Sequence, residues 1–309
     1  MKSTNLHPQY KGVVLTLLAV CFLAGNGYFA KGLETNTLSI TLIRSFIAAA
    51  LIGLITWARR KPLTLFNSRD YGLSCLAGVL LGIHWICFFY SMYISSVTLG
   101  MTMLYTYPMM TLVIQAMFMS QRPPKASWIM APLALAGIVV MAQPESASAE
   151  HNMEGIILGL ISALCFAGRN LLQQRYLAAY PPHISVFYQT LVICALIMVL
   201  NLFLPSPQVS FENAEHEWFL WLILGGLFTA LPHSMIASAI NHIGARTVAI
   251  IGCVQPVIAS LFAYHLLGEV ASVSVIVGAV IILCAAAGEV YFSLPKKPER
   301  TLISQAQKV

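Results

Sequence analysis

The sequence predicts an all-α membrane protein with ten transmembrane helices arranged as two inverted five-helix repeats. Three observations lead to this prediction: 58% of the 309 residues are hydrophobic, only 9% are charged, and the apolar residues gather in ten long runs. Soluble domains carry roughly 25% charged residues, so the composition excludes a soluble globular fold. A helix crosses the bilayer with about 20 apolar residues, which is close to the length of these runs.

The runs follow one another with connectors of only a few residues, which leave no room for a soluble domain. Strands of a transmembrane barrel are about ten residues long and alternate in polarity, whereas these runs are longer and apolar on all sides. The first run follows Lys11 and has no clear cleavage site for a signal peptide, so we expect it to remain as a membrane helix. The expected helices are 12–31, 38–58, 71–93, 97–119, 126–142, 154–177, 183–204, 218–240, 245–267 and 272–292.

Positive charges gather on alternate connectors. Lys and Arg accumulate in cytoplasmic loops, and a cytoplasmic N-terminus places 14 of the 17 basic residues on that side. We therefore expect both termini in the cytoplasm and, with such short loops, a bacterial inner membrane. The net charge of +6 belongs to the inner face and gives no reason to expect nucleic acid as a partner. The fourteen residues are Lys2, Lys11, Arg59, Arg60, Lys61, Arg69, Arg122, Lys125, Arg175, Arg246, Lys296, Lys297, Arg300 and Lys308.

The chain contains a weak internal repeat. A shift of 144 residues places Asn26 on Asn170, and a shift of 148 places Pro108 on Pro256. Because each half has five helices, an odd number, the second half enters the membrane from the opposite side. Inverted repeats of this kind recur in secondary transporters, which bind substrate near the midplane between the halves. The expected parts are a cytoplasmic N-terminus (1–11), a first repeat (12–142), an outer linker (143–153), a second repeat (154–292) and a cytoplasmic tail (293–309).

Four segments carry a family resemblance: "CFLAGNGYFAK" from Cys21, "ITLIRSFIAAAL" from Ile40, "FYSMYISSVTLGMTMLYTYP" from Phe89 and "INHIGARTVAIIGCVQPVIASLFAYHLLGE" from Ile240. They resemble the drug/metabolite transporter superfamily, specifically its EamA-type ten-helix members. The last segment, which ends in Gly268-Glu269, is the most specific; its first-half counterpart, Ser120-Gln121, lacks the acid. The resemblance implies alternating-access export of small metabolites, often amino acids or related compounds.

Two arginines lie inside expected helices and away from the helix ends. An ionisable side chain in a membrane helix costs at least about 2.5 to 3.5 kcal/mol on insertion scales, so it usually faces a cavity or a partner. Arg169 lies deep within its run and is the strongest candidate for a substrate-binding residue. Arg44 lies nearer the outer end of its helix, where snorkelling to the interface is an alternative. The repeat places Gln189 at the counterpart position of Arg44.

Other polar and aromatic residues complete the candidate substrate site. Their ordinary alternatives are aromatic packing and, for histidine, a hydrogen bond between helices. We expect a cavity bordered by the first, third, fourth, sixth, eighth and ninth helices. Besides the two arginines and Gln189, the candidate substrate-binding residues are Asn26, His84, Trp85, Tyr105, Tyr107, Asn170 and Gln255.

Pro108 and Pro256 are candidate gating residues. A proline cannot donate the helical hydrogen bond, so these two would free the carbonyls of Leu104 and Gly252. A membrane helix tolerates this where neighbouring groups or a wet cavity satisfy the carbonyl. We expect both helices to bend and close the cavity from alternate sides, with packing alone as the plain alternative. His233 and Glu269 are the remaining candidates for gating or coupling, since no acidic residue lies in the middle of an expected helix.

A buried arginine without a carboxylate partner favours an anionic group on the substrate. We therefore expect an amino acid or related carboxylate compound as the substrate. The alternatives within the superfamily are a sugar-phosphate or nucleotide-sugar facilitator and a multidrug exporter. The coupling ion is left open, and so is a facilitator that follows the substrate gradient.

Other classes of protein find little support in the sequence. A membrane-embedded enzyme would need a catalytic constellation, and the chain has no H-E-x-x-H, no G-x-S-x-G and no paired intramembrane carboxylates. We therefore expect no catalytic residue and no cofactor. We also expect no metal, because the seven cysteines lie within the runs without metal or disulfide spacing. A channel is disfavoured because no filter-like motif occurs. The expected partners are a small-molecule substrate and the lipid bilayer; a homodimer is left open.

Overall fold

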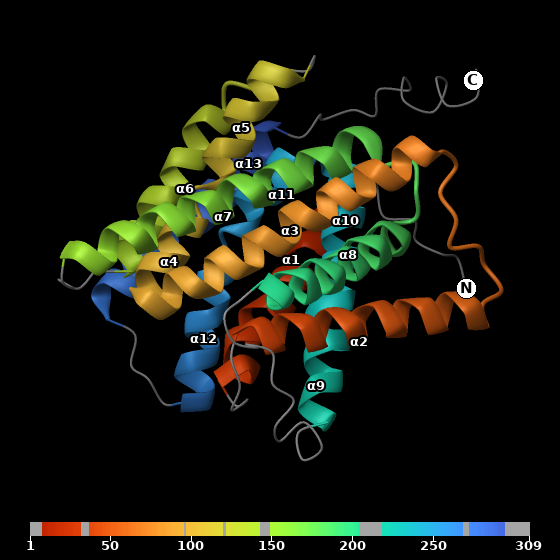
Figure 1. The fold of residues 1–309 in the computed structure, drawn as a ribbon. Helices are drawn as coiled ribbons and strands as arrows, with labels where there is room; N and C mark the ends of the chain where they lie inside the picture. Colours follow the sequence, from red (N-terminus) through yellow and green to blue (C-terminus); the bar gives the residue numbers. More distant parts are fainter. Residues whose placement is uncertain are drawn as a thin grey trace.

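The computed structural model describes residues 8–31, 37–95, 97–119, 122–142, 149–203, 218–267 and 272–293. Every regular element in this part of the chain is a helix (Figure 1). The first half contains α1 (Pro8–Lys31), α2 (Thr37–Ala58), α3 (Ser68–Ile94), α4 (Val97–Leu104), α5 (Tyr107–Phe118) and α6 (Ser127–Ala142). The second half contains α7 (Ala149–Tyr176), α8 (Pro182–Phe203), α9 (Trp218–Gly225), the π-helix η1 (Gly226–Ala230), α10 (Leu231–Ile243), α11 (Ala245–Gly252), α12 (Gln255–Leu267) and α13 (Val273–Ser293).

The predicted all-α membrane fold is confirmed. Eight segments of the described chain are long and apolar enough to cross a membrane, and α6 is a shorter apolar helix. The fourth predicted span is divided between α4 and α5. Large apolar side chains such as Phe46 and Leu202 are exposed on the outside of the bundle, as a surface in contact with lipid tails requires.

Each of the two prolines stands in the first turn of a new helix and not within a continuous one. The chain leaves α4 at Leu104 and begins α5 at Tyr107, so Pro108 occupies a position where a missing N–H costs no helical hydrogen bond. Pro256 stands in the same way directly after Gln255, the first residue of α12. The fourth and ninth spans are therefore interrupted at equivalent places.

The turn between α11 and α12 leaves a backbone carbonyl for another helix. The N–H of Cys253 donates to the carbonyl of Ile250 at 3.2 Å, three residues back instead of four. The carbonyl of Ala249 is thereby skipped, and it accepts a hydrogen bond from the Tyr107 hydroxyl at 2.9 Å. The carbonyl that accepts a hydrogen bond from the other half is therefore that of Ala249. It lies three residues before Gly252, whose carbonyl the sequence led us to expect to be freed. The difference arises because the turn tightens ahead of the proline.

The eighth span contains the π-helix η1, directly before Leu231 and Pro232. The hydroxyl of Thr229 donates to the carbonyl of Leu224 at 2.7 Å, five residues back. Thr229 is fully buried, so the wider turn directs its side chain into the bundle. Short π-helical segments are rare and frequently lie at functional sites.

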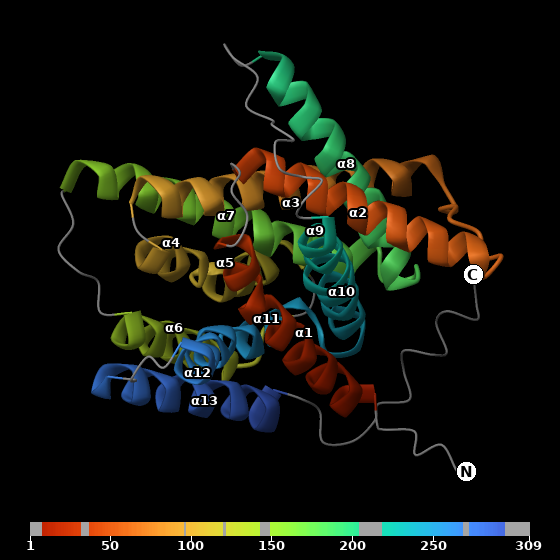
Figure 2. The ribbon, with the colours of Figure 1, turned by 90° about the horizontal axis from the view of Figure 1, so that it is seen from below.

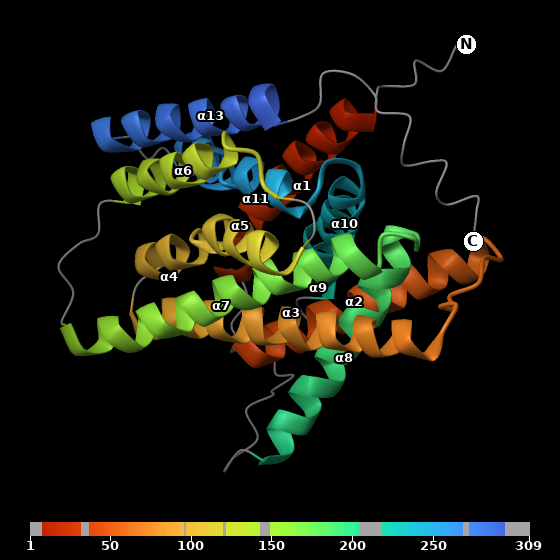
Figure 3. The ribbon, with the colours of Figure 1, turned by 90° about the horizontal axis from the view of Figure 1, so that it is seen from above.

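The helices of the two halves pack in exchangeable pairs. α3 packs along α7. The counterpart of α3 in the other half is α10 and the counterpart of α7 is α1, and these two helices also pack on each other. α2 packs on α8 and α6 packs on α13, and each of these pairs exchanges with itself. Figures 2 and 3 show α6 beside α13 on one flank, with α3 beside α7 across the molecule. A pseudo-twofold axis between inverted repeats produces this pattern.

A buried carboxylate joins three helices at one end of the bundle. We call this end, where α10 ends and α11 begins with Arg246 in its first turn, the basic end. Glu289 of α13 is 0% exposed. It accepts hydrogen bonds from Ser127 at 2.8 Å and Thr247 at 3.0 Å, and it pairs with Arg246 at 3.3 Å. The sequence did not indicate that Glu289 would tie α13 to α6 and α11.

Two glycines bring the backbones of α6 and α13 into contact. A Cβ on Gly278 would lie 2.5 Å from the carbonyl oxygen of Gly137, and a Cβ on Gly137 would lie 2.9 Å from the carbonyl oxygen of Gly278. Small residues permit such close approach of membrane helices.

We predict that Gly278→Ala pushes α13 away from α6 and lowers the free energy of unfolding by about 1 to 3 kcal/mol, the usual cost of overpacking. Gly72→Ala is the matched control, because no atom lies within 4 Å of its added Cβ. Thermal unfolding of both purified variants in detergent measures the difference, and equal midpoints would contradict the tight contact.

Candidate functional site

A small cavity of about 40 Å³ lies between the two interrupted spans. Such a volume has room for a few water molecules but not for an amino acid, so a bound substrate requires helices or side chains to move. Of the six helices expected to border the cavity, the third contributes none of the lining residues. These are Thr16, Val20 and Leu23 of α1; Leu104, Tyr105 and Tyr107 of the fourth span; Phe166 and Asn170 of α7; Ile236 of α10; and Val248, Gly252 and Gln255 of the ninth span.

Two polar groups of this cavity have no hydrogen-bond partner within the described residues. They are the hydroxyl of Tyr105 and the side-chain N–H₂ of Asn170, and both residues are almost completely buried. A buried polar group left without a partner costs about 1 to 3 kcal/mol. These two groups can therefore bind a polar ligand that enters the cavity.

Arg169 lies next to the cavity wall. Its Nε donates to Oε1 of Gln189 on α8 at 2.7 Å, and its Nη1 donates to Oδ1 of Asn170 at 3.0 Å. Its Nη2 is buried and has no partner in the described part of the chain. Because Asn170 lines the cavity, a single hydrogen bond connects the guanidinium to the cavity wall.

Arg44 of α2 is 1% exposed, so its guanidinium is enclosed within the bundle. Its Nε donates to the hydroxyl of Thr229 in η1 at 3.1 Å. The guanidinium carbon lies 4.2 Å from the centre of the Trp85 ring, an arrangement that attracts a cation to the aromatic face. Nη1 of Arg44 has no partner among the described residues.

The two histidines near these arginines differ in their contacts. Nδ1 of His84 lies 2.8 Å from the hydroxyl oxygen of Ser162, so His84 joins α3 to α7, which is the structural alternative that the sequence left open. His233 packs edge-on against Trp85 with ring centres 5.2 Å apart. Neither ring nitrogen of His233 has a partner within the described chain.

The predicted site residues thus fall into two neighbouring groups. Tyr105, Tyr107, Asn170 and Gln255 line the cavity. The second group, which we call the basic cluster, contains Arg44, His84, Trp85, Arg169, Gln189 and His233. None of the basic cluster lines the cavity.

The remaining candidates stand apart from these two groups. Pro108 and Pro256 are the second residues of the helices that follow the two breaks. Asn26 belongs to α1, but its side chain lies outside the described part of the structure. Glu269 lies outside the described residues altogether.

Sequence reasoning missed Phe166, which links the two groups. Its ring centre is 4.5 Å from that of His84 and 5.0 Å from that of Tyr107. A signal was present, because Ser162, Phe166, Arg169 and Gln173 follow one another at spacings of four, three and four and therefore share one face of α7. Thr229, the partner of Arg44, carries no such signal, since its direction depends on the π-helix.

No carboxylate pairs with Arg44 or Arg169 in the described part of the chain, where the recorded ion pair is that of Arg246 with Glu289. The described residues also contain no group of three or more His, Cys, Asp or Glu side chains that could hold a metal ion. The centre of the bundle therefore combines two buried cations with unpaired polar groups and an adjoining cavity.

Residues 10–143 and 153–290 each match the EamA-like transporter family. The chain belongs to this family. A threonine/homoserine exporter of Escherichia coli K12 is 27% identical over 85% of this chain and 85% of its own. An S-adenosylmethionine uptake transporter of Rickettsia felis is 23% identical over 89% of this chain and 90% of its own. An uncharacterized transporter of Archaeoglobus fulgidus is 24% identical over 88% and 93%, respectively.

The fold is shared with a solved structure. One crystal structure superimposes with a TM-score of 0.78, covering 97% of this chain and 100% of the other at 15% identity. This likeness shows the fold alone. The family match identifies the protein as a multi-pass EamA-type membrane transporter, as the sequence predicted, and its named relatives are transporters and not enzymes.

We predict that Gly252→Ala in this EamA-type chain displaces the Tyr107 hydroxyl, because the added Cβ would meet that oxygen directly. Tyr107→Phe alone should cost about 0.5 to 1.5 kcal/mol, the net value of a typical hydrogen bond. The double variant should recover much of the loss caused by Gly252→Ala, since the colliding oxygen is absent. Thermal unfolding of the three variants gives the coupling energy, and simply additive losses would contradict the contact.

Proposed function

We propose that this transporter moves an amino acid or a related small carboxylate compound out of the cell by alternating access. The proposal is carried by the two buried arginines, each of which keeps a guanidinium nitrogen without a partner in the described chain. A substrate carboxylate would supply an acceptor for such a nitrogen, and charge-assisted hydrogen bonds of this kind are roughly twice as strong as neutral ones. A cationic drug would meet repulsion from the same charges.

The named relatives support this class of substrate. Threonine, homoserine and S-adenosylmethionine, the compounds in their names, all carry an α-amino carboxylate. The cavity also offers the unpaired Tyr105 hydroxyl and Asn170 amide for the polar groups of such a compound. Export is proposed from the likeness to the threonine/homoserine exporter, while the uptake transporter is named for the opposite direction.

The interrupted spans provide the moving parts in this proposal. In each of them, a short helix reaches the cavity and a second helix has a proline in its first turn. Rotation about the breaks before Pro108 and Pro256 would widen the cavity toward one end or the other. His233 and Glu269 remain proposed coupling residues. By the positive-inside rule, the basic end faces the cytoplasm of a bacterial inner membrane in this proposal.

Counterflow in proteoliposomes tests the substrate class. Vesicles loaded with an unlabelled amino acid should accumulate the same labelled amino acid, for at least one member of a panel that includes threonine and homoserine. The corresponding amino acid amide, which lacks the carboxylate, should neither exchange nor compete. If no carboxylate compound moves while purely cationic drugs do, the proposal is wrong. Efflux from preloaded cells then tests the direction.

We predict that Arg169→Gln reduces counterflow at least about tenfold, since a hydrogen bond to a charged group contributes about 1.5 to 3 kcal/mol. Arg169→Lys keeps the charge but cannot bond Gln189 and Asn170 in the same forked geometry, so it should recover only part of the rate. Arg122→Gln, which removes an exposed arginine between α5 and α6, is the control. Unchanged counterflow in Arg169→Gln, with equal protein in the vesicles, would remove Arg169 from the site.

A further inference from the structure

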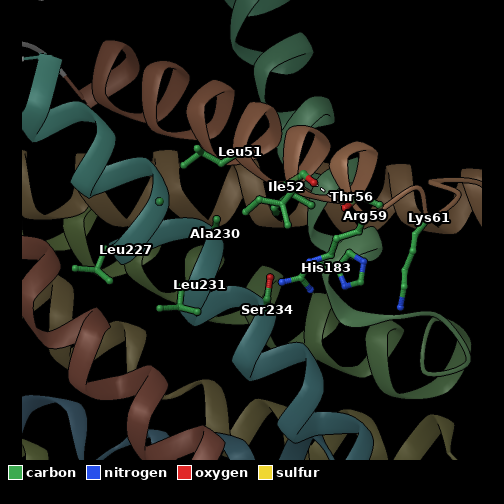
Figure 4. Close-up of a pocket in the computed structure, with 12 residues that line it drawn as sticks. Leu51, Ile52, Thr56, Arg59, Lys61, His183, Leu227, Ala230, Leu231 and Ser234 are labelled. Atoms are coloured by element: carbon green, nitrogen blue, oxygen red, sulfur yellow. Dashed lines mark hydrogen bonds between the residues drawn. The ribbon is translucent and has the colours of Figure 1, made fainter.

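A second, larger hollow lies on the side of the bundle, apart from the candidate substrate site. Its volume is about 430 Å³, within the range of small-molecule binding sites. It lies between α2, the start of α8, η1 and α10 (Figure 4), and we call it the lateral groove. It shares no residue with the cavity. Its lining residues are Leu51, Ile52, Ile55, Thr56, Arg59, Lys61, His183, Gly226, Leu227, Ala230, Leu231 and Ser234.

The lateral groove is polar at one end and apolar at the other. Figure 4 shows Arg59 and His183 close to Ser234, with Lys61 beside them, whereas Leu51, Leu227 and Leu231 lie toward the opposite end. None of the lining residues is acidic. The polar end therefore presents two basic side chains, an imidazole and a hydroxyl group, and none of the residues that line the groove supplies a carboxylate.

Apolar side chains that line the lateral groove are exposed on the outside of the bundle. Ile55 is 50% exposed, Leu227 is 41% exposed and Leu231 is 36% exposed. In a membrane-spanning bundle, side chains on such a surface face lipid tails. An occupant of the lateral groove must therefore be amphipathic, because it has to satisfy this apolar wall and the positive charges at the same time.

We propose that the lateral groove binds one anionic phospholipid. The phosphate lies among Arg59, Lys61 and His183, and an acyl chain follows Leu51, Ile55 and Leu231 toward the membrane interior. Charge complementarity selects the headgroup: the negative charge of an anionic lipid is attracted by both cations, whereas the ammonium of a zwitterionic lipid would be repelled by them and would find no acidic side chain in the groove. Basic pockets between membrane helices are known to bind anionic headgroups. The proposal does not depend on which compound is transported.

The full chain is purified with equal amounts of phosphatidylglycerol and phosphatidylcholine of the same acyl chains, and native mass spectrometry counts the lipids that it retains. The wild type should retain phosphatidylglycerol in preference. Arg59→Gln combined with Lys61→Gln should reduce this preference about thirty-fold, because each basic residue near an anionic lipid contributes about 1 kcal/mol. Leu231→Trp, which fills the groove without changing its charge, should also release the lipid.

Arg122→Gln combined with Lys125→Gln is the matched control, since it removes the same charge at exposed positions outside the groove. An equal loss in this control would indicate diffuse attraction and overturn the proposal, as would a wild type without preference or full retention in Leu231→Trp. Excess inorganic phosphate should not displace the lipid; displacement would identify the groove as a site for free phosphate instead. The two single variants, Arg59→Gln and Lys61→Gln, provide the same comparison if the double variant does not fold.

Discussion

The burial of two guanidinium groups within a membrane bundle is the constraint on which the centre of this structure depends. A cation removed from water is costly unless hydrogen bonds replace its hydration. Arg169 obtains them from Gln189 and Asn170, and Arg44 obtains one from Thr229. Each arrangement ties helices together: α7 to α8 in one case, and α2 to η1 in the other. The hydrogen bond that satisfies Arg44 therefore also joins the two halves, whereas the hydrogen bonds of Arg169 join two helices of the second half.

The interrupted spans solve a related problem for the backbone. A continuous helix hides its carbonyl groups, whereas a break leaves some of them for other partners. Here the break of the ninth span leaves the carbonyl of Ala249, and the hydroxyl of Tyr107 from the fourth span satisfies it. Gly252 supplies the space that Tyr107 needs. The two breaks thus support each other across the pseudo-twofold axis, and the cavity lies where they meet.

The helices α2 and η1 face two different environments at once. On the inside they carry Arg44 and Thr229, while on the outside Ile55 and Leu227 line the lateral groove. The π-helix makes this possible, because its wider turn directs Thr229 inward while Leu227, two residues earlier, is 41% exposed. The segment that fixes one of the buried arginines is therefore also the segment that would touch a bound lipid.

The sequence by itself determined the membrane class, the ten runs, the inverted order of the halves and the places of the two breaks. These follow from hydropathy, segment length and proline chemistry, which act locally along the chain. It also picked out Arg169, Asn170 and Tyr107 as polar residues inside apolar runs. Only the tertiary structure decided how these residues divide between the cavity and the basic cluster. It likewise decided that Thr229 faces Arg44, that Phe166 links the two groups and that Glu289 ties three helices, because each contact joins residues from different helices and depends on how those helices rotate and approach.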